Sequence, residues 1–266
     1  MSDLTVGPED SPLAALGHHP ANYTGGEADV VRGLAEAFEA SLLPLAQRLQ
    51  AFPRHVRRQD IARFLVKHEL FRLALPVNGS VVECGVFAGG GLMSWVHFSA
   101  IHEPYNHSRR VIGFDTFDGF PSVASQDTAT GTSAHLTPGG LRTTAPVQEE
   151  LHQLATLHDR NRPLGHIPKV ELVAGDACQT VAEYVQRNPH LLVSLLYLDF
   201  DLYAPTAAAL EVLYPRIPRG GVVAFDELNC ADFPGETTAL LGALDLSAVR
   251  LLRFPWDPYI SYFVKE

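Results

Sequence analysis

Hydrophobic residues occur along the chain in short aliphatic or β-branched runs, separated by longer segments in which apolar positions have helical spacing. Each run has about the length of a buried strand, and each ends in, or is followed directly by, a glycine or an acid. The runs are residues 81–84, 111–115, 170–174, 191–198 and 221–225, and the segments between them that predict helices are 92–98, 147–158 and 178–187. Strands that alternate with helices in this order predict an α/β fold with a doubly wound, mostly parallel sheet.

The amino-terminal part of the chain has a different pattern. Residues 1–27 are rich in Gly, Pro, His and Asp and have no apolar period, which predicts an arm that is either loose or packed on a partner. Residues 29–50, interrupted at Pro44, and residues 59–75 have amphipathic helical spacing. These helices are predicted to form a substrate-side cap, a dimer surface or plain cover for the core.

We therefore divide the chain into two parts. Residues 1–75 are predicted to form an amino-terminal arm and helical extension, and residues 76–266 the main α/β domain. A helical extension with a long arm favours a homo-oligomer.

Composition and charge exclude several classes of partner. The formal net charge is -10 and the sequence pI is near 5.6, which disfavours nucleic acid and anionic membranes because both are polyanions. No apolar stretch approaches the ~20 residues of a membrane span. The three cysteines lack metal-type spacing, which suits buried thiols in a reducing compartment. We expect a soluble, cytoplasmic protein.

A glycine-rich turn follows the first predicted strand. Four glycines between Gly85 and Gly91 remove Cβ atoms that would keep a ligand away from the backbone. A strand, glycine turn and helix in this order form the crevice in which open α/β sheets bind nucleotide-like ligands. Leu92 and Met93 stand where a phosphate-binding P-loop needs Lys and Ser or Thr, and Phe87 stands where a dinucleotide fingerprint has its second glycine.

The remaining candidate ligand carries no phosphate. S-adenosylmethionine carries a sulfonium and an ammonium group, so an acid such as Glu83 beside the turn is favourable. Asp115, at the end of the second strand, is predicted to accept the two ribose hydroxyls. Asp176 is predicted either to bind the adenine amine or to cap the following helix. The predicted cofactor-binding residues are Glu83, Gly85, Val86, Phe87, Gly89, Ser94, Asp115, Asp176, Ala177 and Asp199.

Residues 116–146 form a long Ser, Thr and Gly-rich connection without an apolar period. A connection of this length in a compact domain is functional or disordered. We interpret it as a lid over the substrate, with Phe117 and Phe120 as aromatic contacts, and the alternative is an ordinary loop. His135 in this segment is one candidate for a general base.

Four acids follow two neighbouring strands. Asp199 and Asp201 come after residues 191–198, and Asp226 and Glu227 come after residues 221–225. Because acids packed at one sheet edge repel each other, a divalent cation between them is expected. Oxygen ligands favour Mg²⁺ over Zn²⁺. Asp199, Asp226 and Glu227 are the predicted ligands, with Asp201 as second choice, and the alternative is that these acids are solvated or cap helices.

Four motifs carry a resemblance to a known family. They are Val-Glu-Cys-Gly-Val-Phe-Ala-Gly-Gly, Gly-Phe-Asp-Thr-Phe-Asp-Gly-Phe-Pro, Leu-Tyr-Leu-Asp-Phe-Asp-Leu-Tyr-Ala-Pro-Thr and Leu-Tyr-Pro-Arg-Ile-Pro-Arg-Gly-Gly-Val-Val-Ala-Phe-Asp-Glu. Together, over residues 81–225, they resemble the macrocin O-methyltransferase family. The resemblance implies a class I methyltransferase Rossmann-like fold and S-adenosylmethionine- and Mg²⁺-dependent methylation of sugar hydroxyls in antibiotic biosynthesis. It also implies a metal site at Asp199, Asp226 and Glu227, where Glu227 departs from the family's usual pair of aspartates.

The chemistry expected from this site is methylation of a deoxysugar or a glycosylated natural product. Mg²⁺ bound to two adjacent hydroxyls would lower the pKa of the attacking one, and Asp199, Asp201 or His135 would take the proton. The expected substrate is a small-molecule glycoside or a nucleotide-sugar. The alternatives are an O-methyltransferase for a catechol-like or other phenolic diol, a nucleotide-sugar dehydrogenase or reductase, and a module that only binds S-adenosylmethionine.

The carboxyl-terminal pattern supports the methyltransferase class. Residues 247–254 and 259–264 flank Pro255-Trp256-Asp257-Pro258 and predict a β-hairpin at the sheet edge with an antiparallel last strand. Methyltransferases of the common α/β class close with such a pair. Trp256 is predicted either to line the substrate mouth or to pack within the hairpin.

Overall fold

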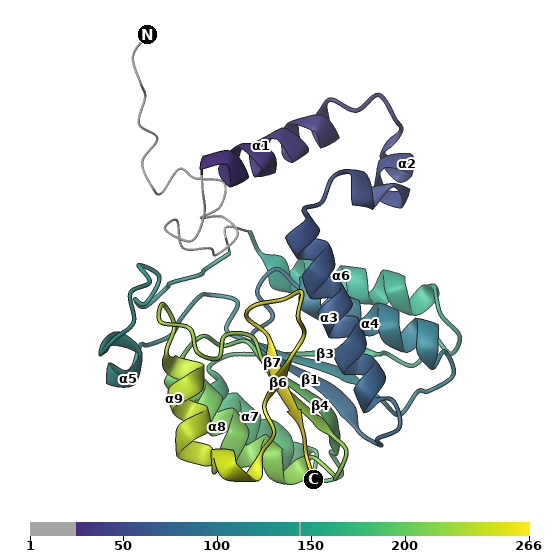
Figure 1. Ribbon diagram of the computed structural model, residues 1–266. Coiled ribbons are helices and arrows are strands. Elements are labelled where there is room, and N and C mark those ends of the chain that lie inside the picture. The colour runs from purple at the N-terminus through teal and green to yellow at the C-terminus, as the bar shows by residue number, and fades with distance from the viewer. Residues whose placement is uncertain (1–24, 144) are drawn as a thin grey trace. The chain divides into compact units, whose positions relative to one another are not determined.

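The computed structural model describes residues 25–143 and 145–266, which Figure 1 shows as a coloured ribbon. The chain divides into two compact units, residues 1–63 and 64–266. This division lies inside helix α3 (Arg58–Ala74), whereas the sequence pattern placed it after residue 75. Most of the predicted arm lies outside the described residues.

The first unit contains short helical segments. They are α1 (Gly25–Glu39), α2 (Leu45–Gln50), the 3-10 turn η4 (Phe52–Arg54) and the first turn of α3. Pro44 is the residue that precedes α2, which confirms the predicted interruption. The Arg48 guanidinium lies 4.8 Å from the centroid of the Phe38 ring and donates to the Phe38 carbonyl at 2.6 Å, and this contact ties α2 to the end of α1.

The second unit is built on a seven-stranded sheet. Its strands are β1 (Ser80–Cys84), β2 (Val111–Asp115), β3 (Val170–Ala174), β4 (Val193–Leu198), β5 (Val222–Phe225), β6 (Leu252–Arg253) and β7 (Ser261–Val264). They lie in the order β3-β2-β1-β4-β5-β7-β6, and β7 runs antiparallel to β5 while the first five strands are parallel. This confirms the predicted doubly wound sheet with an antiparallel strand at its end.

Helices cover both faces of the sheet (Figure 1). The elements of this unit outside the sheet, after α3, are α4 (Gly90–His102), α5 (Ser125–Thr128), α6 (Val147–Arg160), α7 (Ala177–Arg187), α8 (Tyr203–Leu213), η5 (Tyr214–Arg216), α9 (Gly235–Ala243) and η6 (Leu246–Ala248). The core on one face includes residues of α3, α4 and α6, and the core on the other includes residues of α7, α8 and α9. Strand residues alternate between these two cores, as the pleat requires.

The carboxyl-terminal hairpin is shorter than predicted. The sequence placed its first strand over residues 247–254, but only Leu252–Arg253 pair with β7, and residues 246–248 form η6 instead. The Asp245 carboxylate accepts from the Ser247 backbone N–H at 2.9 Å and starts this turn. A local side-chain cap therefore replaces the extended backbone expected there.

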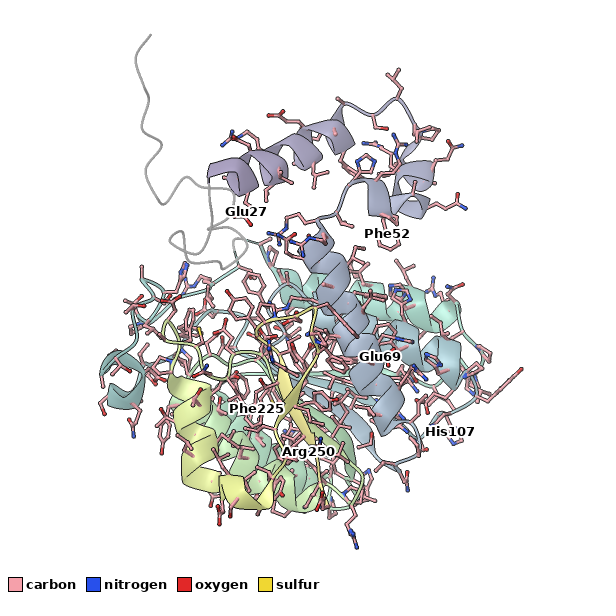
Figure 2. All side chains as sticks on the ribbon, in the orientation of Figure 1. Glu27, Phe52, Glu69, His107, Phe225 and Arg250 are labelled. Carbon is pink, nitrogen blue, oxygen red and sulfur yellow. The ribbon has the colours of Figure 1, made fainter. Side chains whose placement is uncertain are left out.

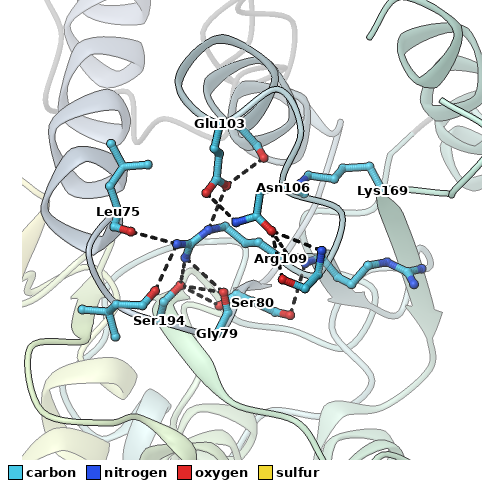
Figure 3. A network of polar contacts seen from close by, with 12 residues as sticks. Leu75, Gly79, Ser80, Glu103, Asn106, Arg109, Lys169 and Ser194 are labelled. Atoms are coloured by element: carbon cyan, nitrogen blue, oxygen red, sulfur yellow. Dashed lines mark hydrogen bonds and ion pairs between the residues drawn. The ribbon is translucent and has the colours of Figure 1, made fainter. Parts of the chain in front are cut away.

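A buried network fixes the amino-terminal edge of the sheet (Figure 3). The Arg109 guanidinium is paired with Glu103 at 2.8 Å and donates to the hydroxyl of Ser194. It also donates to three backbone carbonyls, those of Leu75, Val77 and Gly79, at 3.0 to 3.1 Å. This network joins the α3–β1 connection to the start of β2 and to β4.

No helix among residues 25–143 and 145–266 combines the length and the hydropathy that crossing a bilayer requires.

Candidate functional site

The glycine turn after β1 packs directly on the end of β4. Gly85 has a φ of 94°, and a Cβ built on it would lie 1.8 Å from the Asp199 carbonyl oxygen. The Asp199 N–H donates to the Cys84 carbonyl at 2.7 Å. Gly89 also has a positive φ and precedes the first turn of α4. Glycine at residue 85 therefore lets the predicted cofactor turn touch the strand end that carries the predicted metal ligand.

Asp115 holds the same turn from the other side. One of its carboxylate oxygens accepts the backbone N–H groups of Val86 and Phe87 at 2.7 and 2.8 Å, and the other accepts the Phe117 N–H at 2.7 Å. The structure therefore brings together four predicted cofactor residues, Gly85 among them. The ribose contact of Asp115 stays a prediction, and its observed contacts give the carboxylate a second task, which is to shape the turn.

Asp176 and Ser94 have local partners. Asp176 caps α7 by accepting the Cys178 N–H at 2.9 Å, which confirms the capping interpretation and leaves the adenine contact a prediction. Ala177 is the buried first residue of that helix. The Ser94 hydroxyl donates to the Gly90 carbonyl at 2.7 Å within α4.

Glu83 lies beneath α4, and its predicted contact with the cofactor stays a prediction. Its residue is 1% exposed, and its carboxylate is 3.6 Å from the Lys67 ammonium of α3. A Cβ at Gly91 would lie 1.9 Å from the Glu83 carboxylate, so this glycine lets the helix approach the acid. Burial raises the pKa of Glu83 to about 7, although Lys67 and Trp95 act in the opposite direction.

The raised pKa predicts a pH dependence of stability. The folded protein binds more protons than the unfolded chain between pH 4.5 and about 7, so the stabilisation is complete at low pH and is lost as the pH rises through this window. Relative to a Glu83→Gln variant, the free energy of unfolding of wild type should fall by up to about 1.4 kcal/mol for each unit by which the pH rises through this window. Denaturant unfolding at several pH values measures this. A Glu211→Gln change on the exposed side of α8 is the control, and parallel curves for wild type and Glu83→Gln would contradict the prediction.

The four predicted strand-end acids lie around a fifth acid. Phe225, labelled in Figure 2, is the last residue of β5, and Asp226 and Glu227 follow it directly. Glu236, in the first turn of α9, is fully buried and accepts backbone N–H groups from Phe200 and Asp201 after β4 and from Glu227 after β5. It thereby ties together the two loops that carry the predicted ligands.

Glu236 is not among the site residues predicted from the sequence. The sequence signal is a glutamate directly after Pro-Gly, and the structure places it in the first turn of α9, a position at which an acid satisfies free backbone N–H groups. Glu236 accepts backbone N–H groups of the two loops rather than of its own helix. This arrangement depends on tertiary packing, which the local sequence does not specify.

Mutual repulsion among these acids is strong. Burial raises the pKa of Asp201 well above its usual range, and the charges of Glu227, Asp199, Glu236 and Asp226 raise it further. Glu236 has a raised pKa for the same reasons. A set of crowded carboxylate oxygens fits a hard divalent cation by its chemistry. Within residues 25–143 and 145–266, however, no three His, Cys, Asp or Glu side chains are grouped closely enough to hold a metal ion.

The predicted lid is a folded segment with its own small core. Asp127, in α5, is fully buried and accepts the Ala124 N–H at 2.9 Å and the Tyr203 N–H, at the start of α8, at 2.7 Å. Leu136 of this segment packs with Leu202 and Phe233, which follow β4 and β5. The segment is therefore anchored beside the acidic cluster, while its function as a lid and the role of the half-buried His135 remain predictions.

The hairpin loop lies at the same edge. Phe225 of β5 pairs with Ser261 of β7, so the residues just before β7 lie beside Asp226. Phe254 stacks on Tyr262 with ring centroids 5.0 Å apart, and Trp256 packs against Phe254 while remaining 49% exposed. Because the Trp256 side chain has one packed face and one open face, its substrate role and its packing role both stay predictions.

Comparison with known proteins gives a family match and a curated relative. Residues 72–235 match the family described as macrocin-O-methyltransferase (TylF). A curated relative from Streptomyces olivaceus, 8-demethyl-8-(2,3-dimethoxy-alpha-L-rhamnosyl)-tetracenomycin-C 4'-O-methyltransferase, is 29% identical over 159 residues, which are 58% of this chain. The match spans 55% of that relative's length.

Solved structures match over most of the chain. The calicheamicin methyltransferase CalS11 is 31% identical with a TM-score of 0.87, and the match covers 91% of this chain and 93% of CalS11. Its apo structure, described as a TDP-rhamnose 3'-O-methyltransferase, is also 31% identical and gives a TM-score of 0.79 over 91% and 95% of the two chains. The O-methyltransferase NovP, 20% identical with a TM-score of 0.57 over 77% and 80%, shares the fold. These matches confirm the predicted class I methyltransferase fold.

Proposed function

Because this chain belongs to the macrocin O-methyltransferase family, we propose that it transfers a methyl group from S-adenosylmethionine to a hydroxyl of a deoxysugar. The acceptor is a nucleotide-linked sugar or a sugar on a natural product. The observation that carries the proposal is the acidic cluster at the carboxyl-terminal edge, in backbone contact with the glycine turn through Gly85 and Asp199. The rhamnose substrates named for two similar proteins support this acceptor class.

The glycine turn and Asp115 form the cofactor side of the proposed site. Asp115 ends β2 and is half-buried, so its carboxylate oxygens lie at the sheet edge where nucleosides bind in this fold class. The three backbone N–H groups that it accepts also hold the turn in place.

We expect an Asp115→Asn variant to bind S-adenosylhomocysteine about 10- to 100-fold more weakly. The amide loses charge-assisted hydrogen bonds worth about 1.5 to 3 kcal/mol each, to the ribose and to the turn. Isothermal calorimetry measures the affinity. The control is Asp118→Asn, which changes an exposed acid paired with Arg142 in the next loop. Equal affinities for the Asp115 variant and wild type would exclude the ribose role.

The acceptor side of the proposed site is the acidic cluster. Asp199, Asp226 and Glu227 would hold Mg²⁺, which would supply Lewis-acid polarisation of the acceptor hydroxyl. Their repulsion supports this assignment because a bound cation offsets it. The observed side-chain arrangement does not by itself group three ligands, so these side chains must turn toward the ion when it binds.

Asp201 is the favoured general base. It has a left-handed φ of 62° in the loop after β4, and burial together with the neighbouring acids raises its pKa above the usual range, which makes its carboxylate a stronger base. In the proposed reaction, S-adenosylmethionine would supply the methyl group to the acceptor oxygen and leave as S-adenosylhomocysteine, while the hydroxyl proton would pass to Asp201. The sulfonium becomes a neutral thioether, so the folded segment beside the cluster would assist by excluding water.

The direct test is methyl transfer with two kinds of acceptor. The protein is incubated with S-adenosylmethionine, Mg²⁺ and either TDP-rhamnose or catechol, and products are identified by mass spectrometry. We expect a singly methylated sugar and S-adenosylhomocysteine, and excess chelator should stop turnover while cofactor binding persists. Methylation of catechol alone would favour the phenolic alternative, and unchanged turnover in chelator would exclude the metal.

A further inference from the structure

Tyr197 is a fully buried residue of β4 whose hydroxyl donates to a carboxylate oxygen of Asp226. The strand register pairs Tyr197 with Ala224 of β5. Because side chains alternate along a strand, Asp226 leaves the sheet on the same face as Tyr197. The hydrogen bond therefore joins the strand that leads to Asp199 to the strand that leads to Asp226, directly beneath the acidic cluster.

A buried lysine contacts the ring of Tyr197. Lys67 of α3 is 8% exposed, and its ammonium lies 3.7 Å from the centroid of the Tyr197 ring. The same ammonium is 3.6 Å from Glu83 and 5.5 Å from the centroid of the Trp95 ring. A cation at this depth is stabilised by an acid and by aromatic faces, and it fixes the ring that it contacts.

The hydroxyl of Tyr197 has a role that is separate from the packing of its ring. A phenylalanine at this position would fill the same volume and would keep the contact of its ring with Lys67. A buried hydroxyl costs free energy unless it is hydrogen-bonded, so its presence is compensated through the bond to Asp226. One oxygen of Asp226 is thereby engaged, and the rotation of the carboxylate is restricted.

We propose that Tyr197, held by Lys67, is a positioning residue that aims the second oxygen of Asp226 into the acidic cluster. The proposal rests on the proposed function, in which Asp226 holds a divalent cation. Outer partners that orient a ligating carboxylate typically contribute 10- to 100-fold to metal affinity. Tyr197 touches neither the substrate nor the cofactor in this assignment, and it acts only through Asp226.

The test is the affinity for Mg²⁺ of a Tyr197→Phe variant saturated with S-adenosylhomocysteine, measured by calorimetry. We expect about 10- to 100-fold weaker Mg²⁺ binding, with unchanged affinity for S-adenosylhomocysteine. Turnover should fall at low Mg²⁺ and recover at high Mg²⁺, which a purely structural defect would not produce. A Lys67→Met variant, which keeps an unbranched apolar side chain, is expected to weaken Mg²⁺ binding in the same direction.

Tyr184→Phe is the matched control. Its hydroxyl donates to Glu171 at 2.9 Å, an equivalent tyrosine–carboxylate bond between α7 and the edge strand β3. Wild-type Mg²⁺ affinity in folded Tyr197→Phe would overturn the inference, and so would an equal loss in Tyr184→Phe. If wild type itself neither binds Mg²⁺ nor methylates a sugar, the proposed function fails. If wild type does both and Tyr197→Phe is identical to it, only the positioning role fails.

Discussion

Replacing Asp226 by asparagine is expected to lower kcat/KM for sugar methylation by about 10²- to 10³-fold, the loss of several kcal/mol of transition-state stabilisation. Asparagine has nearly the same shape and can still accept the Tyr197 hydrogen bond. It lacks the negative charge that a divalent cation requires of this position. The affinity for S-adenosylhomocysteine should not change, because Asp226 lies on the acceptor side of the proposed site. Steady-state kinetics over a series of Mg²⁺ concentrations, together with calorimetry, measure both effects.

The control for this variant is Asp245→Asn. Asp245 is an exposed acid that caps η6, so the same chemical change occurs outside the cluster. Wild-type kcat/KM in Asp226→Asn would remove the acidic cluster from the mechanism. If cofactor binding were lost as well, the residue would serve folding rather than the acceptor side.

Replacing Arg109 by methionine is expected to lower the free energy of unfolding by about 3 to 5 kcal/mol, as observed when one partner of a buried ion pair is removed. The change leaves the Glu103 carboxylate without the guanidinium and removes the donors to the carbonyls of Leu75, Val77 and Gly79. For a domain of this size the loss corresponds to a decrease in Tm of roughly 10 °C. Calorimetric or fluorescence melting measures it.

Arg110→Met is the adjacent control. The Arg110 side chain is 34% exposed and lies 3.6 Å from Glu171, and a solvent-exposed pair of this kind contributes about 1 kcal/mol or less. If both variants melted at the same temperature, the network shown in Figure 3 would not stabilise the sheet edge in the way that its contacts suggest.

Strand positions could be predicted well because each strand has a distinct local pattern. The run from Val111 to Asp115 was predicted with the bounds that the structure has, since β-branched residues begin it and an acid ends it. The four-residue helix α5 could not be predicted, because a helix this short has no apolar period. It forms where Asp127 finds the Tyr203 N–H, a partner distant in sequence.

The candidate site was partly predictable for a topological reason. Parallel neighbouring strands end at one edge, so the acids after β4 and β5 were expected at the same edge, and the pairing of β4 with β5 places the two loops there. The orientation of Glu83 was not predictable from strand alternation alone. It depends on Lys67, which reaches it from a helix preceding the sheet, and on Gly91, which lets α4 cover it.

The contact between Gly85 and Asp199 has a practical consequence for protein engineering. Any side chain at residue 85 would separate the turn from the strand end, so a single substitution would disturb the cofactor and acceptor sides of the proposed site together. Mutant libraries that seek new acceptors should therefore keep this glycine invariant. Diversity is better introduced on the outward side of residues 117–143, whose own apolar anchor at Leu136 can be retained while the surface is varied.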